Sequence, residues 1–104
     1  QPHRYAPVTP LSTTFTFRGS TFRQLRRTGK VALYSRGVGD AIDGYEVIRI
    51  KDIPEATWPN GKTTPAHEGY PGDNEFGVRG WYYMKGDVDA AERRFKAEAR
   101  RGES

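Results

Sequence analysis

The sequence contains no cysteine, a single methionine and only two histidines among its 104 residues. Without cysteine the chain has no disulfide bonds and no thiolate chemistry, which agrees with the reducing interior of a cell. A zinc site of the usual kind is not expected, because such sites draw most of their ligands from cysteine and histidine. We therefore predict no metal, no cofactor and a cytoplasmic location.

Long apolar runs are also missing. No stretch approaches the ~18 apolar residues of a membrane-spanning helix, so no membrane partner is expected. Hydrophobic residues form only 35% of the chain while aromatic residues reach 12%, so the core is expected to depend on a few large rings. This length is typical of one domain, and we predict a single domain over residues 1–104.

Acidic residues are absent from residues 18–36, where six basic residues lie. Residues 1–53 hold nine Lys and Arg against four Asp and Glu, a local charge of +5 compared with +4 for the whole chain. Such a density attracts phosphate, an anionic membrane or an acidic protein face. The alternative is a solvated sheet face that charge keeps soluble. The expected basic surface consists of Arg18, Arg23, Arg26, Arg27, Lys30 and Arg36.

Alternating apolar residues over residues 14–36 predict a three-stranded meander. Its turns are expected at Gly19-Ser20 and at Gly29. Phe22 and Leu25 are three residues apart and would face opposite sides of a regular strand, so a bulge is expected there.

The clearest strand is the stretch YEVIRIKDI, which follows a glycine- and aspartate-rich loop over residues 37–44. A strand that is apolar on both faces is expected to be central in the sheet. Its two apolar faces carry Ile48 and Ile50 on one side and Tyr45 and Val47 on the other.

Proline marks two segments without regular periodicity. Residues 1–10 contain three prolines and are expected to form an extended N-terminal arm. Residues 54–75 contain four prolines and form a long loop before the last strand. Within this loop, Asn60-Gly61 is the two-residue turn signal of a small β-finger.

The stretch NEFGVRGWYYM, residues 74–84, predicts the last strand of the sheet. Its expected core face carries Phe76, Val78, Gly80, Tyr82 and Met84. The other face carries Arg79, Trp81 and Tyr83, which either pack beneath the long loop under Trp58 and Tyr70 or form an exposed platform for stacking bases.

A helix is predicted over residues 87–101, with Asp87 or the Asp89 to Glu92 pair at its start. Its apolar stripe, formed by Val88, Ala91, Phe95 and Ala99, is expected to lie on the sheet. The fold class is therefore α+β: an antiparallel sheet of about five strands in a meander, one C-terminal helix on a face, and a proline-rich loop between strands four and five.

Catalytic motifs are weak. The GKT at residues 61–63 lacks the first glycine of a phosphate-binding P-loop, so a turn is favoured. In HEGYPGDNEF, the carboxylates of Glu68, Asp73 and Glu75 could hold a divalent metal, with His67 as the base for phosphodiester hydrolysis. The same residues are more typical of loop anchors that hydrogen-bond a long connection. We therefore predict that the protein is not an enzyme, with a metal-dependent hydrolase as the minor alternative.

The run YEVIRI, followed by WPNGKTTPAHEGYP and by FGVRGW before an acid-capped helix, resembles a group of small uncharacterised proteins of phages, prophages and mobile elements. The resemblance covers roughly residues 20–100 and implies a setting, but no activity and no catalytic residues. The strand and helix at the end are also similar to the WGR domain of nucleic-acid-responsive proteins, although the Trp-Gly-Arg triplet is absent.

Two functions follow as expectations. The first is a small non-enzymatic protein that binds nucleic acid or a nucleoprotein complex, with the basic residues on phosphates and Arg79, Trp81 and Tyr83 against bases or ribose. The alternative is an anti-CRISPR-like inhibitor that docks on a host defence or polymerase complex through the loop at 54–75. In that case the partner-binding residues are Trp58, His67, Glu68 and Tyr70.

Overall fold

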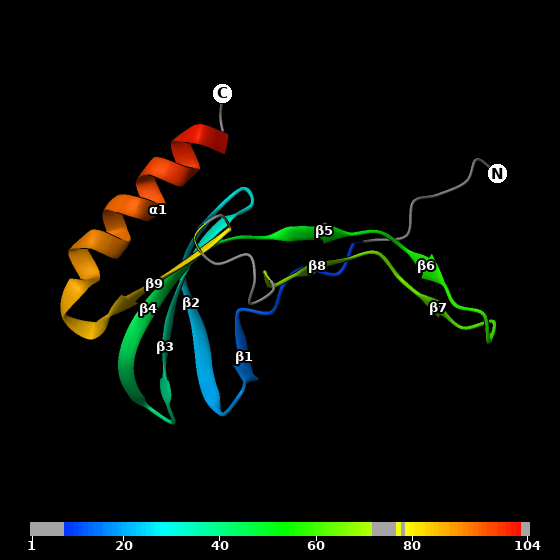
Figure 1. The fold of residues 1–104 in the computed structure, drawn as a ribbon, viewed down its shortest axis with the longest axis horizontal. Coiled ribbons are helices and arrows are strands. Elements are labelled where there is room, and N and C mark those ends of the chain that lie inside the picture. Colours follow the sequence, from blue (N-terminus) through cyan, green and yellow to red (C-terminus); the bar gives the residue numbers. More distant parts are fainter. Residues whose placement is uncertain (1–7, 72–76, 78, 103–104) are drawn as a thin grey trace.

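The computed structural model describes residues 8–71, 77 and 79–102. Five antiparallel strands form one sheet in the order β1-β2-β3-β4-β9, and a C-terminal helix packs on one of its faces (Figure 1). This arrangement confirms the predicted α+β class. The elements are β1 (Thr14–Phe17), β2 (Ser20–Thr28), β3 (Val31–Val38), β4 (Ala41–Arg49), β9 (Gly80–Met84), the short 3-10 helix η2 (Lys85–Asp87) and α1 (Val88–Gly102).

Tight turns join the first four strands. Arg18 and Gly19 both have positive φ, 53° and 82°, as the two-residue hairpin turn between β1 and β2 requires. The turn thus lies one residue earlier than predicted. Gly29, with φ of 59°, begins the next turn, and the expected bulge interrupts β2 between Gln24 and Arg26.

The predicted loop over residues 37–44 is wrong. Val38 pairs with Ala41, so only a two-residue turn at Gly39 and Asp40 separates β3 from β4. Gly39 has φ of 61°, which suits such a turn. Glycine and aspartate in this stretch therefore mark a hairpin whose strands continue almost to the turn.

Each face of the sheet carries its own apolar cluster. The helix side buries Val31, Leu33 and Val47 against Ala91 and Phe95 of α1. The opposite side, called the open face below, buries Phe22, Ala32, Tyr34, Ile48 and Ile50, with Leu11, Phe15 and Tyr70 packed at its margin. The alternation of apolar residues in the fourth strand is confirmed, and that strand lies between β3 and β9.

The predicted core face of the last strand is wrong. Trp81 and Tyr83 pack at the edge of the cluster beneath α1, whereas Tyr82 and Met84 are exposed. The reason is that η2 and α1 fold back over the face carrying Trp81, and coverage by the helix decides which face is buried. Gly80 is buried, and Phe76 and Val78 lie outside the described residues.

The helix begins within one residue of the prediction. Ala91 and Phe95 of the expected stripe are buried, but Val88 is exposed and Ala99 is only partly covered. Glu98, which the stripe did not include, is buried beside them. The helix therefore packs on the sheet with a mixed apolar and acidic face.

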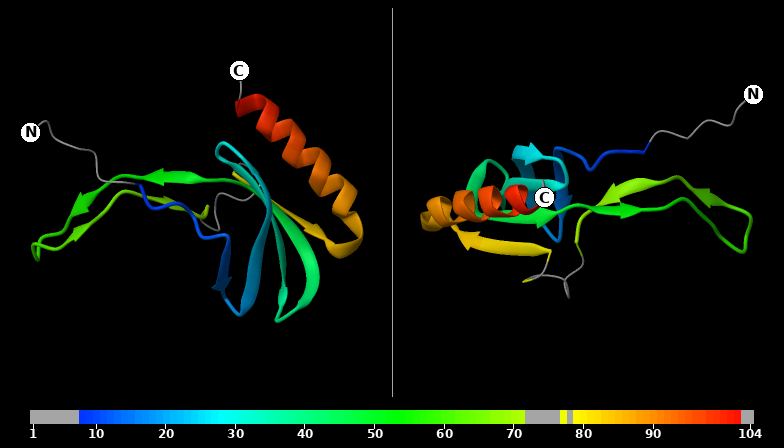
Figure 2. Two further views of the ribbon diagram at one scale, coloured as in Figure 1. Left: turned by 180° about the vertical axis from the view of Figure 1, so that it is seen from behind. Right: turned by 90° about the horizontal axis from the view of Figure 1, so that it is seen from above.

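The long proline-rich loop is a two-tier β-hairpin over residues 51–69, called the finger below. β5 (Lys51–Ile53) pairs with β8 (His67–Gly69), and further out β6 (Ala56–Thr57) pairs with β7 (Thr63–Thr64). The finger starts earlier than predicted, because β5 follows β4 after Ile50 alone. Figure 2 shows it extending beyond the sheet in two views, which gives the molecule a long axis of 52 Å.

The described part of the N-terminal arm runs along the base of the finger. Thr9 forms a parallel bridge with His67, and its backbone exchanges hydrogen bonds with Ala66 and Glu68. The arm residues 1–7 lie outside the described part of the chain. Residues 8–10 thus extend the two-stranded base of the finger by a third short segment.

The close approach at Gly37 gives a test of the β3–β4 register. A Cβ at this position would overlap the backbone carbonyl of Ala41, so Gly37→Ala should lower the free energy of unfolding by about 1–3 kcal/mol. At Gly86 an added Cβ would meet nothing within 4 Å. Gly86→Ala should therefore stay within about 0.5 kcal/mol of the wild type in urea unfolding. Equal effects of the two substitutions would contradict this register.

Candidate functional site

The basic residues of 18–36 are distributed over different parts of the molecule. Side chains alternate along β2, so Arg26 faces Glu92 of the helix at 3.3 Å while Arg27 reaches Glu68 on the open face. Arg23 binds the carbonyl of Gly39 and the carboxylate of Asp40 in the β3–β4 turn. The expectation of one shared basic flank is therefore corrected. The remaining members of that set also have contacts: Lys30 pairs with Asp52 and Glu68, Arg36 pairs with Glu46, and Arg18 lies over the ring of Phe17.

A buried carboxylate fastens the finger to the sheet. Glu68 of β8 accepts two hydrogen bonds from the Arg27 guanidinium, at 2.7 and 2.6 Å, and a third from the Lys30 ammonium. Its Oε1 also accepts from the backbone N–H of Leu11 at 2.9 Å. Lys30 in addition donates to Asp52 of β5 at 2.7 Å. We call this group, Glu68 with Leu11, Arg27, Lys30 and Asp52, the Glu68 clamp.

The charge on Glu68 is strongly favoured. Hydrogen bonds from Arg27, with Lys30 and the amide of Leu11 in addition, outweigh the cost of burial and hold the pKa of Glu68 well below its usual value. The same contacts raise the pKa of Arg27 and, through Asp52 and then Glu68, that of Lys30. Both basic side chains therefore form ion pairs within the fold.

The tip of the finger presents one large aromatic side chain. Trp58 lies just after β6 and is 54% exposed. Its indole N–H donates to Thr64 Oγ1 at 2.8 Å, and the backbone of Trp58 bonds to Lys62 and Gly61 across the turn. Asn60 closes the turn by accepting from the amide of Lys62 at 3.0 Å. The indole is therefore held in a defined orientation.

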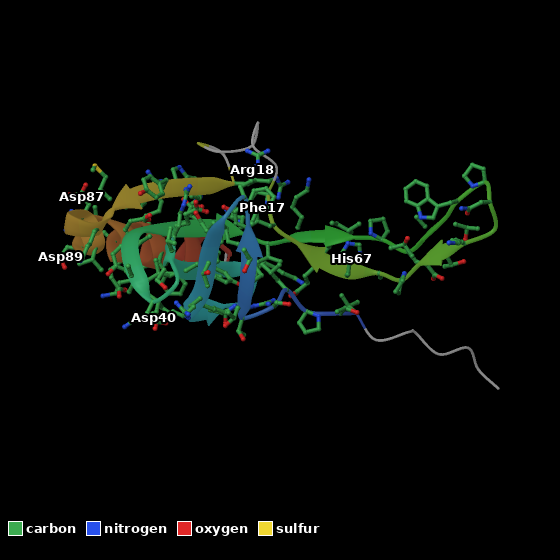
Figure 3. The ribbon with its side chains drawn as sticks, turned by 90° about the horizontal axis from the view of Figure 1, so that it is seen from below. Phe17, Arg18, Asp40, His67, Asp87 and Asp89 are labelled. Atoms are coloured by element: carbon green, nitrogen blue, oxygen red, sulfur yellow. The ribbon has the colours of Figure 1, made fainter. Side chains whose placement is uncertain are left out.

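The four residues predicted to bind a partner do not lie together. Trp58 is at the tip, whereas His67 lies on β8, where Figure 3 shows it well behind the tip, and its Nδ1 is 3.0 Å from the carbonyl of Pro65. Glu68 is buried in the clamp, and Tyr70 packs against Phe15, Phe17 and Phe22 on the open face. Of the four, only Trp58 presents a large exposed aromatic surface on the projecting end.

Trp81 and Tyr83 do not form an exposed stacking platform. The guanidinium of Arg94 lies 4.7 Å from the Trp81 ring centroid, and its Nε donates to the hydroxyl of Tyr83 at 3.1 Å. Both rings lie partly buried beneath α1. Cover by Trp58 and Tyr70 is also wrong, because the helix supplies it. Arg79, the third residue predicted for this face, lies in the turn before β9 and its carbonyl accepts from the amide of Arg49.

A second buried carboxylate lies under the helix. Glu98 is 1% exposed and receives the guanidinium groups of Arg49 at 2.8 Å, Arg101 at 3.1 Å and Arg94 at 3.5 Å. Burial alone would raise the pKa of Glu98, but Arg49 and Arg101 hold that pKa below its usual value. The cluster joins α1 to β4, and the carboxylate of Glu98 neutralises part of the positive charge of the helix.

A pocket of about 320 Å³ lies on the open face. Figure 3 shows Phe17 and Arg18 beside each other at the end of β1, and both residues line this pocket. Glu46 is 2% exposed, and its carboxylate accepts from Arg36 at 3.0 Å and from the hydroxyl of Tyr70. Burial raises the pKa of Glu46, and the hydrogen bonds offset this only in part. The pocket is lined by Phe17, Arg18, Phe22, Arg36, Glu46, Tyr70 and Tyr82.

The minor hydrolase expectation concerned His67, Glu68, Asp73 and Glu75. Glu68 is engaged by Arg27 and Lys30, and Asp73 and Glu75 lie outside the described residues. Within residues 8–71, 77 and 79–102, no group of three or more His, Asp or Glu side chains is placed to hold a metal ion. In the same ranges, no helix has the length and apolar character needed to cross a membrane.

Comparisons of the chain with protein-family models, with curated proteins and with solved structures found no match. The resemblance to phage and mobile-element proteins therefore stays an expectation.

The sequence did not predict that Glu46, Phe17, Phe22 and Tyr82 line a pocket. An acid between the apolar residues Tyr45 and Val47 of β4 was the available signal for Glu46. The position of Glu98, three residues after Phe95 on the buried side of the helix, was a similar signal. Each is a carboxylate within an apolar stripe, and such a carboxylate needs a buried partner.

The Glu68 clamp predicts how acid acts on stability. Because folding lowers the pKa of Glu68, its contribution is complete above the ordinary glutamate pKa of about 4.3 and is lost as the pH falls further. Glu68→Gln should lower the free energy of unfolding at pH 7 by about 1–3 kcal/mol and flatten its decline below about pH 4. The control is Glu55→Gln, at an exposed position of the same finger. Identical pH profiles for the two variants would contradict the clamp.

Proposed function

We propose that this protein is a non-enzymatic interaction module that docks on another protein through its finger, with Trp58 as the anchor residue. The observation that carries the proposal is a half-exposed indole, fixed by a hydrogen bond to Thr64, at the end of a hairpin that projects from the body. Tryptophan is the residue type most enriched among the anchors of protein interfaces. An indole held in place before binding also loses less conformational entropy on association.

The finger suits penetration into a concave partner. Its base is fastened at Glu68, Lys30 and the segment around Thr9, so the tip is positioned relative to the sheet. Its outer tier is a narrow two-stranded hairpin, and Trp58, Pro59 and Asn60 at the turn are exposed. A projecting rigid hairpin with one aromatic anchor places most of its binding energy in a single pocket of the partner.

The charge of the finger favours a protein over a nucleic acid. Residues 51–69 carry two lysines and three carboxylates, a net charge of −1. Nucleic-acid affinity depends on neutralising phosphates with Lys and Arg, which the finger does not supply in excess. The basic residues of β2 and β3 are also paired with acids on different faces. These observations support the protein-docking alternative over the nucleic-acid expectation.

The phage or mobile-element setting that the sequence resembles would make the partner a host complex, and inhibition of a defence or polymerase complex remains part of this proposal. The partner chemistry that Trp58 requires is an apolar pocket rimmed by polar groups.

Capture of the partner from host extract tests the proposal. Trp58→Ala should weaken partner retention at least about thirtyfold, the loss of about 2 kcal/mol or more typical of an anchor residue. The variant should remain folded, because Trp58 is half exposed. Val38→Ala, which removes another exposed apolar side chain outside the finger, should retain the partner fully.

Two further experiments identify the class of the partner. Retention should survive nuclease treatment of the extract, since the proposed contact is with protein. With Trp58 kept, a photo-crosslinking residue at the exposed position 62, opposite Trp58 in the hairpin, should attach to the retained protein, and the same residue at position 38 should not. Loss of retention after nuclease, or equal crosslinking from both positions, would overturn the proposal.

A further inference from the structure

The pocket on the open face contains an arginine whose binding capacity is mostly unused. A guanidinium has five N–H donors in a fixed planar fork. Within the part of the chain that the structure describes, the Arg36 side chain makes one hydrogen bond, from Nη1 to Glu46. Its side chain is 36% exposed and lines the pocket. The remaining donors are available to a ligand.

Arg36 is also held in place before any ligand binds. Its guanidinium carbon lies 5.7 Å from the Phe22 ring centroid and 5.0 Å from that of Tyr82, and Glu46 fixes one end. Cation–π contacts and a charge-assisted hydrogen bond restrict the rotamers of this long side chain. Such preorganisation reduces the entropy that a ligand must overcome.

The acidic group of the pocket does not offer a site for a cation. One oxygen of Glu46 accepts from Arg36 and the other from Tyr70, and the residue is almost completely buried. Among the described residues that line the pocket, Glu46 is the one carboxylate and both of its oxygens are occupied, whereas Arg36 has spare donors. An anion, rather than an ammonium group, complements this arrangement.

We propose that this pocket binds a small aromatic carboxylate, with the carboxylate on the Arg36 fork and the ring against Phe17 and Tyr82. The volume of about 320 Å³ is near the lower end of the roughly 300–1,000 Å³ of small-molecule sites, which suits one or two rings. A planar carboxylate matches the fork with two parallel hydrogen bonds. A doubly charged phosphate is less suited, because it would face stronger repulsion from Glu46.

Titration of the intact, isotope-labelled protein with three matched probes tests this inference. Benzoate carries the anion, benzamide is its neutral analogue and benzylamine is cationic. Benzoate should shift the amide signals of residues 17–22, 36 and 82, and it should bind about ten- to hundredfold more tightly than benzamide. Benzylamine should leave these signals unchanged. Equal binding of benzoate and benzamide, preferred binding of benzylamine, or no response to benzoate would overturn the inference.

Two variants and a control locate the site. Arg36→Gln should weaken benzoate binding about ten- to hundredfold, whereas Arg23→Gln, the same charge change on a neighbouring strand outside the pocket, should have no effect. Tyr82→Ala removes an exposed wall residue, and it should weaken binding several-fold in a folded protein. If Arg36→Gln does not fold, the test depends on Tyr82→Ala. An unchanged benzoate affinity in that variant would overturn the assignment of the site. None of these changes touches Trp58, so partner retention through the finger is measured separately.

Discussion

The buried carboxylate of Glu68 is the constraint on which the arrangement of this molecule depends. It lies on β8, yet its hydrogen bonds come from the N-terminal segment at Leu11, from β2 at Arg27 and from the β2–β3 turn at Lys30. A two-stranded hairpin alone is at best marginally stable in water. Fastening its base to the sheet through charged hydrogen bonds gives the finger a fixed direction. The exposed indole at the tip is thereby placed at a defined position relative to the body.

Pairing with buried acids also accounts for where much of the positive charge of the chain lies. Three acids, Glu46, Glu68 and Glu98, are almost completely buried, and each receives at least one arginine. An uncompensated buried carboxylate would be costly, so these pairs are requirements of the fold. A basic sequence therefore yields a surface on which much of the charge is already paired. Arg36 differs from Arg27, because Arg36 satisfies its acid with one donor whereas Arg27 uses two.

Local signals in the sequence predicted the elements of the fold well. The glycines at the hairpins, the bulge in β2 and the start of the helix depend on neighbouring residues only. The turn of the finger lies at Pro59-Asn60, one residue before the predicted Asn60-Gly61. The faces of β9 could not be predicted, because they depend on where α1 folds back. The Arg27–Glu68 contact joins residues 41 apart in the chain, and no local pattern reports such a partner. Because these distant partners leave no local pattern, the cluster of basic residues over 18–36 was predicted to be a binding surface, and the pocket around Glu46 was not predicted.

The rigidity of the finger is tested most directly by residual dipolar couplings of backbone amides in the wild type and in Glu68→Gln. In the wild type, the couplings of residues 51–69 should fit the same alignment tensor as those of β2, β3 and β4. In the variant, the finger should require a separate tensor with smaller couplings, since its fastening is lost. A wild-type finger that already reorients independently of the sheet would contradict this account.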